Sequence, residues 1–370
     1  MRVKALLVFV GLLSVSACAP DNTHEQNTNP VHAVGETRPV SSAGDAADDA
    51  AIWVHPDDPL QSAIIATDKD SGLMVYDLAG NLLEHLPLGE VNNVDLRDGF
   101  VLNGEQVTLI AASNRTDNTL LLLTIDPATR RLRLLDDTLI KLELENAYGL
   151  CMYHSLSRDR FYVFITSTGD GRVEQWKLLD RAGTIQAQRV RTFTVGSVAE
   201  GCVADDRYAT LYISEEERGI WRYGAEPWEG DLRLLIDEIG GEGNLKADLE
   251  GLGIYWDATG ASYLVASNQG SSEFAVYDQA NDYTYLGSFT IVSHGAVDGV
   301  TVTDGLDLVS ADLGPAYPQG MMVVQDHRNT HPSANQNFKL VSWADVARAL
   351  DLPDPTRQDP TNWSYYPRPS

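Results

Sequence analysis

The sequence predicts an all-β protein, a six-bladed β-propeller. A polar residue followed by Gly and an apolar residue recurs along the 370-residue chain, with the glycines separated by 52, 50 and 48 residues. Each copy continues with an apolar strand, a small or polar pair, a turn and a strand rich in aromatics. Six copies of roughly four strands fit a propeller. No alternating helices of about 10–15 residues favour a solenoid or a βαβ fold.

The first 17 residues have the form of a signal peptide. Arg2 and Lys4 precede an apolar stretch that is too short to span a bilayer as a helix. The run Val15-Ser16-Ala17-Cys18 resembles a bacterial lipoprotein box, which predicts lipid attachment at Cys18. We therefore expect export and anchoring at the cell envelope, with Ala19 favouring the outer membrane; a plain secretory signal with a chance cysteine is the alternative. Residues 18–37 are expected to form a tether, residues 38–350 the propeller, and residues 351–370 a tail.

The repeated motifs place one polar position at the start of each innermost strand. Residues 40–42 and 338–343 are expected to pair and close the ring. The motif copies are, in chain order, Asp48-Asp49-Ala50, Asn93-Val94-Asp95, Tyr148-Gly149-Leu150, Glu200-Gly201-Cys202, Glu250-Gly251-Leu252 and Asp298-Gly299-Val300.

Composition limits the partners. The chain has 27 Lys and Arg against 53 Asp and Glu, a formal net charge of −26, which excludes nucleic acid or an anionic membrane surface as the main partner. Three cysteines exclude a disulfide scaffold and a cysteine-built zinc site. Cys151 and Cys202 hold similar places in adjacent copies, and we expect two buried thiols rather than a disulfide.

Acidic residues dominate the positions that a propeller brings to one mouth of its channel. Asp48, Glu200, Asp248, Glu250 and Asp304 would repel one another there unless multivalent cations neutralised them. Carboxylates without His or Cys suit hard ions, and irregular geometry favours calcium over magnesium. The alternative is that these acids cap turns or lie solvated on the surface.

Two bases follow central strands in the same phase. Lys69 and Arg115 beside a calcium-loaded mouth would bind a polyanion, since Arg can grip a phosphate with two hydrogen bonds and Lys acts as a point charge. The alternative is a local ion pair with Asp68 or Asp117.

Taken together, the motifs resemble those of the β-propeller phytases from about residue 40 to residue 345. The runs that carry the resemblance are residues 45–53, Lys69-Asp70-Ser71-Gly72-Leu73, Asn92-Asn93-Val94-Asp95, Ala112-Ser113-Asn114-Arg115, Tyr148-Gly149, Glu200-Gly201, Glu215-Glu216, Asp248-Leu249-Glu250-Gly251-Leu252, Ser267-Asn268-Gln269-Gly270 and Asn335-Gln336-Asn337-Phe338-Lys339.

The resemblance implies a monomeric, calcium-dependent 3-phytase that hydrolyses the phosphomonoesters of myo-inositol hexakisphosphate (phytate). It implies no phosphoenzyme but attack by a metal-activated water. By the resemblance, calcium at the cleavage site would be held by Asp48, Tyr148, Glu200, Asp248, Glu250 and Asp304. Glu216 and Asp170 would flank that site, and Lys69 and Arg115 would hold phosphate. Gln269 and Asp298 would be further calcium positions. Asp49, near Val94, would bind a structural calcium ion, and Asn337 would bind a second one.

Three departures from the family pattern predict weaker phosphate binding or greater reliance on calcium. Ala50 stands where proline is usual, Asp70 replaces a second lysine, and the turn at residues 168–170 lacks a lysine. A calcium-dependent propeller lactonase or esterase and a non-catalytic binding propeller are the alternative functions. Lys69 and Arg115, in register with the acids, favour the phosphatase over both.

Overall fold

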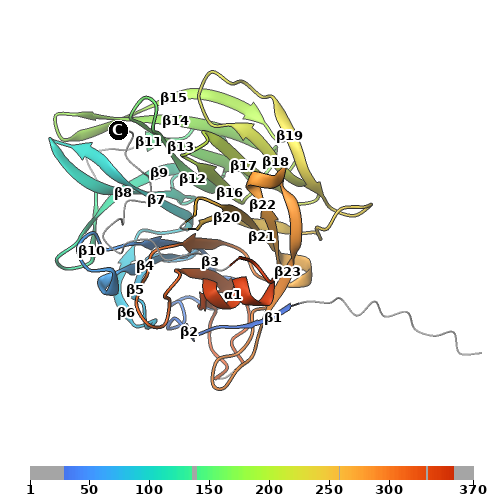
Figure 1. The fold of residues 1–370 in the computed structure, drawn as a ribbon. Coiled ribbons are helices and arrows are strands. Elements are labelled where there is room, and N and C mark those ends of the chain that lie inside the picture. The colour runs from blue at the N-terminus through green and yellow to red at the C-terminus, as the bar shows by residue number, and fades with distance from the viewer. Residues whose placement is uncertain (1–28, 136–139, 258, 331, 354–370) are drawn as a thin grey trace, which may run out of the picture.

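The computed structural model describes residues 29–135, 140–257, 259–330 and 332–353, and these form six β-sheets around a common axis (Figure 1). The predicted six-bladed β-propeller is confirmed. The predicted signal peptide, the lipidation site at Cys18 and the tail from residue 354 lie outside the described residues. Within the described part, no helix is long and apolar enough to cross a membrane.

Each blade is a four-stranded antiparallel core whose first strand lies innermost. Blade 1 contains β3 (Ala47–Trp53), β4 (Ala63–Asp68), β5 (Gly72–Asp77) and β6 (Leu82–Pro87). Blade 2 contains β7 (Val91–Leu102), β8 (Glu105–Asn114), β9 (Thr119–Asp126) and β10 (Arg131–Leu134), with β11 (Ile140–Lys141) also on β9. Blade 3 contains β12 (Ala147–Ser155), β13 (Arg160–Ser167), β14 (Arg172–Arg181) and β15 (Thr184–Thr194).

Blade 4 contains β16 (Cys202–Asp205), β17 (Thr210–Glu215), β18 (Gly219–Gly224) and β19 (Arg233–Glu238). Blade 5 contains β20 (Leu249–Trp256), β21 (Ser262–Asn268), β22 (Glu273–Asp278) and β23 (Thr284–Val292), with β1 (Asn29–His32) added at its edge. Blade 6 contains β24 (Leu306–Val309), β25 (Met321–Asp326), β26 (Asn337–Ser342) and β2 (Gly35–Glu36), and α1 (Trp343–Ala349) follows β26. Three short 3-10 helices cover Pro59–Gln61, Gln269–Ser271 and Gln279–Asn281.

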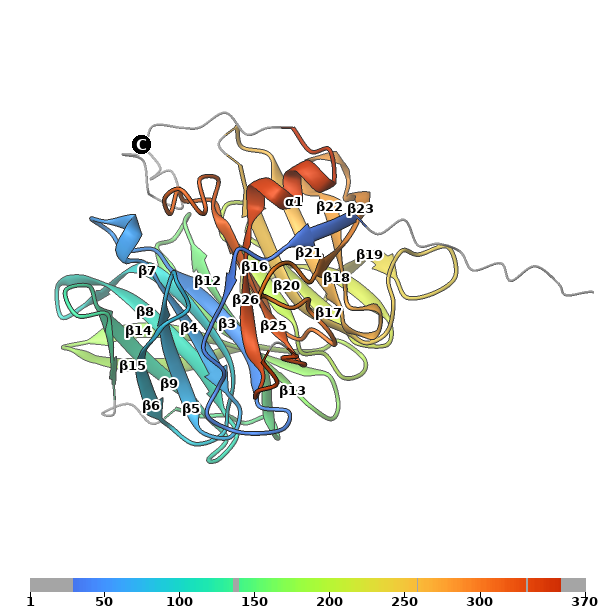
Figure 2. The same cartoon turned by 90° about the horizontal axis from the view of Figure 1, so that it is seen from below.

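The start of the described chain joins two blades. Strand β1 pairs in parallel with β23, and β2 pairs antiparallel with β26, so both chain ends contribute to blade 6 as expected. The pairing segment is Gly35–Glu36, however, and not residues 40–42. The predicted tether over residues 18–37 is therefore wrong for residues 29–37, which contain two strands. Figure 2 shows β1 beside α1, whose Trp343 stacks on Tyr255 at 4.1 Å between ring centroids.

The small or polar pair of each repeat has a structural cause. A hydroxyl at the end of the second strand bonds to the backbone where the innermost strand begins. In blades 1 to 3 the hydroxyls of Thr67, Ser113 and Thr166 accept from the amides of Asp49, Asn93 and Gly149 at 2.9–3.0 Å. In blade 4 the Ser214 hydroxyl donates to the Gly201 carbonyl at 3.0 Å. These bonds hold the polar motif residues in the same place in successive blades.

The sixth copy of the glycine motif is not Asp298-Gly299 but Asp304-Gly305. A Cβ on Gly251 would lie 2.9 Å from the Asp304 carbonyl oxygen, and one on Gly305 would lie 2.7 Å from the Asp48 carbonyl oxygen. Glycine is needed at these positions because in blades 3 to 6 the start of the innermost strand touches the backbone of a neighbouring blade. Gly305 therefore belongs to the ring of close contacts, and Asp304 takes the position that the sequence assigned to Asp298.

The expectation of two free thiols is wrong. Cys151 and Cys202 form a disulfide between β12 and β16, with their α-carbons 5.7 Å apart. Their places are not equivalent, because Cys202 pairs with Ile213 at the start of its strand, whereas Cys151 comes one residue after the corresponding Leu150. Successive residues of a strand point to opposite faces, so this offset of one lets the two sulfurs meet between adjacent blades.

Candidate functional site

Four buried carboxylates meet where the innermost strands begin. Asp48 lies in β3 and Glu250 in β20, while Glu200 and Asp304 come just before β16 and β24; all are at most 8% exposed. Glu216, in the turn after β17, extends toward the same point. One carboxylate oxygen from each of Glu200, Glu216 and Glu250 lies within 4.8 Å of the other two. The predicted convergence of acids at one mouth is thus present in the structure.

Three of these carboxyl groups, those of Glu200, Glu250 and Asp304, hold protons more tightly than ordinary acids. Burial, together with the charges of Asp48 and Glu250, raises the pKa of Glu200 well above its usual value. Burial and the neighbouring Glu216 and Asp304 raise the pKa of Glu250 in the same way. Burial and Asp48 raise the pKa of Asp304 despite the nearby Lys69 ammonium. The cluster therefore lacks the positive charge that it needs at neutral pH.

The Tyr148 hydroxyl belongs to this cluster. It lies in β12 and is hydrogen-bonded to both Glu200 and Glu216. Burial and the charges of Glu200 and Glu250 raise the pKa of Tyr148, so the phenol keeps its proton and donates to a carboxylate.

Several buried oxygens of the cluster lack a hydrogen-bond donor among the described residues. They are Oε1 of Glu216, Oε2 of Glu250 and Oδ1 of Asn92. A buried acceptor without a partner costs free energy unless an ion or water satisfies it. Because all three are oxygens, they fit a hard cation such as calcium.

Asn92 is a functional residue that the motif analysis quoted but did not select. Its side-chain amide is fully buried and donates to Oδ2 of Asp48 at 3.0 Å and to Oε1 of Glu200 at 2.5 Å. It therefore links the acids of blades 1 and 4 across the channel. The strand pairings place Asn92, not Asn93, in register with Asp48 and Tyr148, so the second motif copy is Asn92-Asn93-Val94 rather than Asn93-Val94-Asp95. The signal of Asn92 in the sequence is that the other copies carry an acidic or phenolic residue at this position.

Lys69 binds the cluster rather than its neighbour Asp68. Its Nζ lies 2.9 Å from Asp48, 3.2 Å from Asp45 and 3.9 Å from Asp304. Burial alone would lower the pKa of Lys69, but Asp48 and Asp304 raise it, so the ammonium keeps its charge. Lys69 is the one cation that the described residues supply to these acids by ion pairing.

Arg115 lies half-buried in the turn after β8. Its backbone amide donates to the Glu90 carbonyl at 2.7 Å, which fixes the turn. Its side-chain Nε is buried without a hydrogen-bond partner, and within the described ranges no ion pair to Asp117 forms. The alternative prediction for Arg115, an ion pair with Asp117, is therefore not found among the described residues.

Three predicted site residues make other contacts. Asp170 is exposed and caps its own turn, accepting from Ser167 Oγ at 2.5 Å, and this bond lowers its pKa. Asp248 is also exposed, beside the cluster, where its charge contributes to the raised pKa of Glu216. Gln269 donates its amide to Asp304.

Asp298 and Asn337 lie outside the acidic cluster. The ammonium of Lys339, which is fully buried, lies 2.5 Å from Asp298 and 3.1 Å from Oδ1 of Asn337, and also contacts Glu36. Burial would raise the pKa of Asp298, but the bond from Lys339 lowers it. The Lys339 ammonium thus neutralises acids around the positions to which the resemblance assigned calcium, and it ties β2 to β26.

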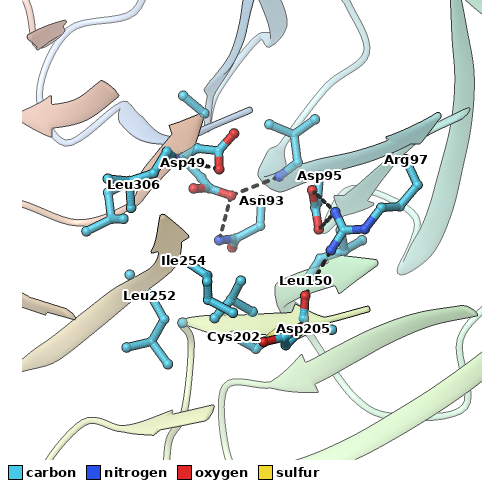
Figure 3. Close-up of a pocket in the computed structure, with 18 of the residues that line it drawn as sticks. Asp49, Asn93, Asp95, Arg97, Leu150, Cys202, Asp205, Leu252, Ile254 and Leu306 are labelled. Atoms are coloured by element: carbon cyan, nitrogen blue, oxygen red, sulfur yellow. Dashed lines mark hydrogen bonds and ion pairs between the residues drawn. The ribbon is translucent and has the colours of Figure 1, made fainter. Parts of the chain in front are cut away.

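Asp49 lines the pocket that Figure 3 shows. Its Oδ2 accepts from the Asn93 amide and from the backbone amide of Val94, each at 3.1 Å. Burial and Asp48 raise the pKa of Asp49. The pocket is lined by residues of all six innermost strands, including Leu150 and Leu306.

The comparisons with known proteins agree with this geometry. A family model described as Phytase matches residues 2–361. The chain belongs to the β-propeller phytase family. The phytase is also 41% identical over 361 residues to the 3-phytase of Bacillus subtilis (strain 168), which covers 95% of this chain and 93% of that protein.

A crystal structure of a functionally unknown protein from Desulfotomaculum acetoxidans DSM 771 is similar with a TM-score of 0.45 and 12% identity. The match covers 65% of the phytase and 70% of that chain. At this level of similarity it adds nothing to the assignment.

Proposed function

We propose that this phytase acts as a 3-phytase, a phosphoric monoester hydrolase that releases inorganic phosphate from phytate with calcium bound at the mouth of the channel. The observation that carries the proposal is the set of buried carboxylates around Glu200, Glu216 and Glu250, whose oxygens converge while Oε1 of Glu216 and Oε2 of Glu250 lack donors. Family membership and the similarity to a 3-phytase support the substrate.

Calcium would be held by Asp48, Tyr148, Glu200, Asp248, Glu250 and Asp304, with Glu216 and Gln269 beside them. Once bound, it would neutralise the carboxylates, polarise phosphate oxygens and make a water more acidic for attack at phosphorus. Asp49, through the same Oδ2 that accepts from Val94, is proposed as a structural ligand. Asp298 and Asn337 are less suited, because Lys339 already neutralises their surroundings.

The basic residues of the site, Lys69 and Arg115, are proposed to bind phosphate groups of the substrate. Lys69 keeps its charge because Asp48 and Asp304 raise its pKa, so its ammonium can pair with a phosphate oxygen when cations bind those acids. Arg115 has an unpartnered Nε and can donate to a second phosphate in two parallel bonds. The Tyr148 phenol keeps its proton and donates a hydrogen bond to the carboxylates, and so orders Glu200 and Glu216. Asp170, bound to its own turn, is proposed to act only at the edge of this site.

The cellular setting belongs to the same proposal. We propose an exported monomer that reaches the cell envelope through a lipid on Cys18, or is secreted. The disulfide between Cys151 and Cys202 supports an oxidising compartment, where such bonds persist.

Phosphate release from phytate, measured with calcium and with excess chelator, tests the proposal. We expect release only with calcium, and loss of release in Glu250→Gln. Glu105→Gln is the matched control, since it removes the same charge from an exposed position at the start of β8. Undiminished release in chelator would overturn the proposal. Turnover of lactones without phosphate release would favour the lactonase alternative, and a stable protein complex without turnover would favour the binding module.

A further inference from the structure

We propose that the disulfide between Cys151 and Cys202 is a positioning element of the site: it sets the distance between β12 and β16 and thereby holds Tyr148 against Glu200. The proposal rests on the proposed function in so far as these two residues bind calcium. It assigns a role to two residues that the acidic cluster itself does not use.

The disulfide takes a place that aspartates occupy elsewhere in the ring. Asp95 of blade 2 accepts from the backbone amide of Met152 in blade 3 at 2.8 Å. Asp307 of blade 6 accepts from the amide of Ile52 in blade 1 at 2.7 Å. The strand pairings show that Asp95, Cys151 and Asp307 are equivalent, each one residue past the first regular pair after the start of its strand. At this level, therefore, the innermost strands of three pairs of blades are tied by side chains, and between blades 3 and 4 the tie is covalent.

The tie lies close to the site in the chain. Tyr148 precedes Cys151 by three residues in β12, and Glu200 precedes Cys202 by two. A Cβ on Gly149 would lie 1.8 Å from the carbonyl oxygen of Glu200, so the two backbones touch between the disulfide and the site. Any widening at the cysteines is therefore transmitted over a few residues of extended backbone to the Tyr148–Glu200 hydrogen bond.

Loss of the disulfide should weaken calcium binding more than it slows turnover. Without it, calcium has to pull Glu200 and Tyr148 into place, and part of its binding free energy is used for that ordering. We expect about a 10-fold loss of calcium affinity, the lower end of what removal of a supporting contact around a metal site typically costs. The turnover number at saturating calcium should change less than about 2-fold, because the bound arrangement is the same.

The test uses the full chain with the double substitution Cys151→Ala and Cys202→Val. These are the residues that blades 1 and 2 carry at the equivalent positions, Ala51 and Val94, so the new side chains are compatible with the repeat. Val173→Ala is the matched control, because Val173 is buried in the same cluster between blades 3 and 4 but lies on the third strand of its blade. Calcium binding is measured by titration calorimetry, and the calcium concentration for half-maximal phosphate release is measured separately.

We expect both calcium measurements to shift about 10-fold in the double variant and to stay unchanged in the control, even where both variants lose thermal stability. Unchanged calcium affinity in the double variant would show that the disulfide is only a structural cross-link. If that variant fails to fold, Cys151→Ser with Cys202→Ser is titrated in its place. Free thiols at both cysteines in a non-reduced peptide map of the parent protein would also overturn the proposal. The calorimetric arm does not need turnover, so a parent protein that binds calcium without hydrolysing phytate would refute the proposed function alone.

Discussion

The substitution Glu250→Gln is expected to have opposite effects with and without calcium. One Glu250 oxygen lies within 4.8 Å of oxygens on both Glu200 and Glu216. Two unit charges at that distance repel by about 3.5 kcal/mol at an effective dielectric constant of about 20, and by about 0.9 kcal/mol in bulk water. Proton uptake removes part of this repulsion, because burial and neighbouring acids raise the pKa of Glu250. A net gain of about 1–2 kcal/mol in the free energy of unfolding remains for the metal-free variant.

In chelator near pH 8 the variant should therefore melt about 2–4 °C above the parent protein. With calcium the order should reverse, since a ligand has been removed, and phosphate release should fall about 100-fold or more. Scanning calorimetry in both conditions measures the first effect, with Glu105→Gln as the control for a change of one charge. If the variant is less stable than the parent protein in chelator, the Glu250 carboxylate stabilises the fold itself, and the expected repulsion within the cluster is wrong.

Three further predictions concern other residues. Metal-free protein should lose stability as the pH rises above about 4.5, because the raised pKa of acids such as Glu250 means that the folded state binds more protons than the unfolded state. A melting temperature in chelator that stays constant between about pH 5 and pH 8 would contradict this. Lys339→Met should lower the free energy of unfolding, measured in urea, by about 3–5 kcal/mol, since it leaves Asp298 and Glu36 without their cation. A decrease of less than about 1 kcal/mol would show that another group neutralises these acids. Arg115→Ala should raise the KM for phytate about 10-fold or more without altering the melting temperature, because its Nε has no hydrogen-bond partner among the described residues. An unchanged KM would remove Arg115 from the phosphate site.

The sequence predicted the blades well because the repeat is a packing requirement. In blades 3 to 6 the innermost strand begins against the backbone of a neighbouring blade, which demands glycine, and the second strand supplies a hydroxyl such as that of Ser113 or Thr166 to the backbone of the innermost strand. Residues in the same phase therefore had to converge. This is why Asp48, Glu200 and Glu250, far apart in the chain, were predicted to meet.

The sixth copy was misplaced because its spacing is irregular. Asp298-Gly299 follows Gly251 by 48 residues and matches the motif, whereas the true contact glycine, Gly305, follows by 54. The additional residues form a loop before β24 that periodicity does not reveal. As a result, Asp298 was assigned to the same convergence as Glu250, although the structure places it beside Lys339.

Side-chain partners were harder to predict than positions. The disulfide depends on an offset of one residue between Cys151 and Cys202, which is smaller than the accuracy of strand boundaries from sequence. Lys339 appeared only as one residue of a family motif, yet it is fully buried and neutralises acids from two segments. Its signal was a charged residue inside an otherwise apolar strand, Phe338 to Val341, which indicates a buried ion pair.

We expect the acidic mouth to bind a polyanion only after cations have filled it. Titration calorimetry with myo-inositol hexasulfate, a polyanion of similar charge without hydrolysable phosphate, tests this directly. We predict no measurable binding to metal-stripped protein and clear binding once calcium is present, with the affinity rising as calcium is added. Equal binding of the hexasulfate in chelator and in calcium would show that the mouth does not need cations to bind a polyanion.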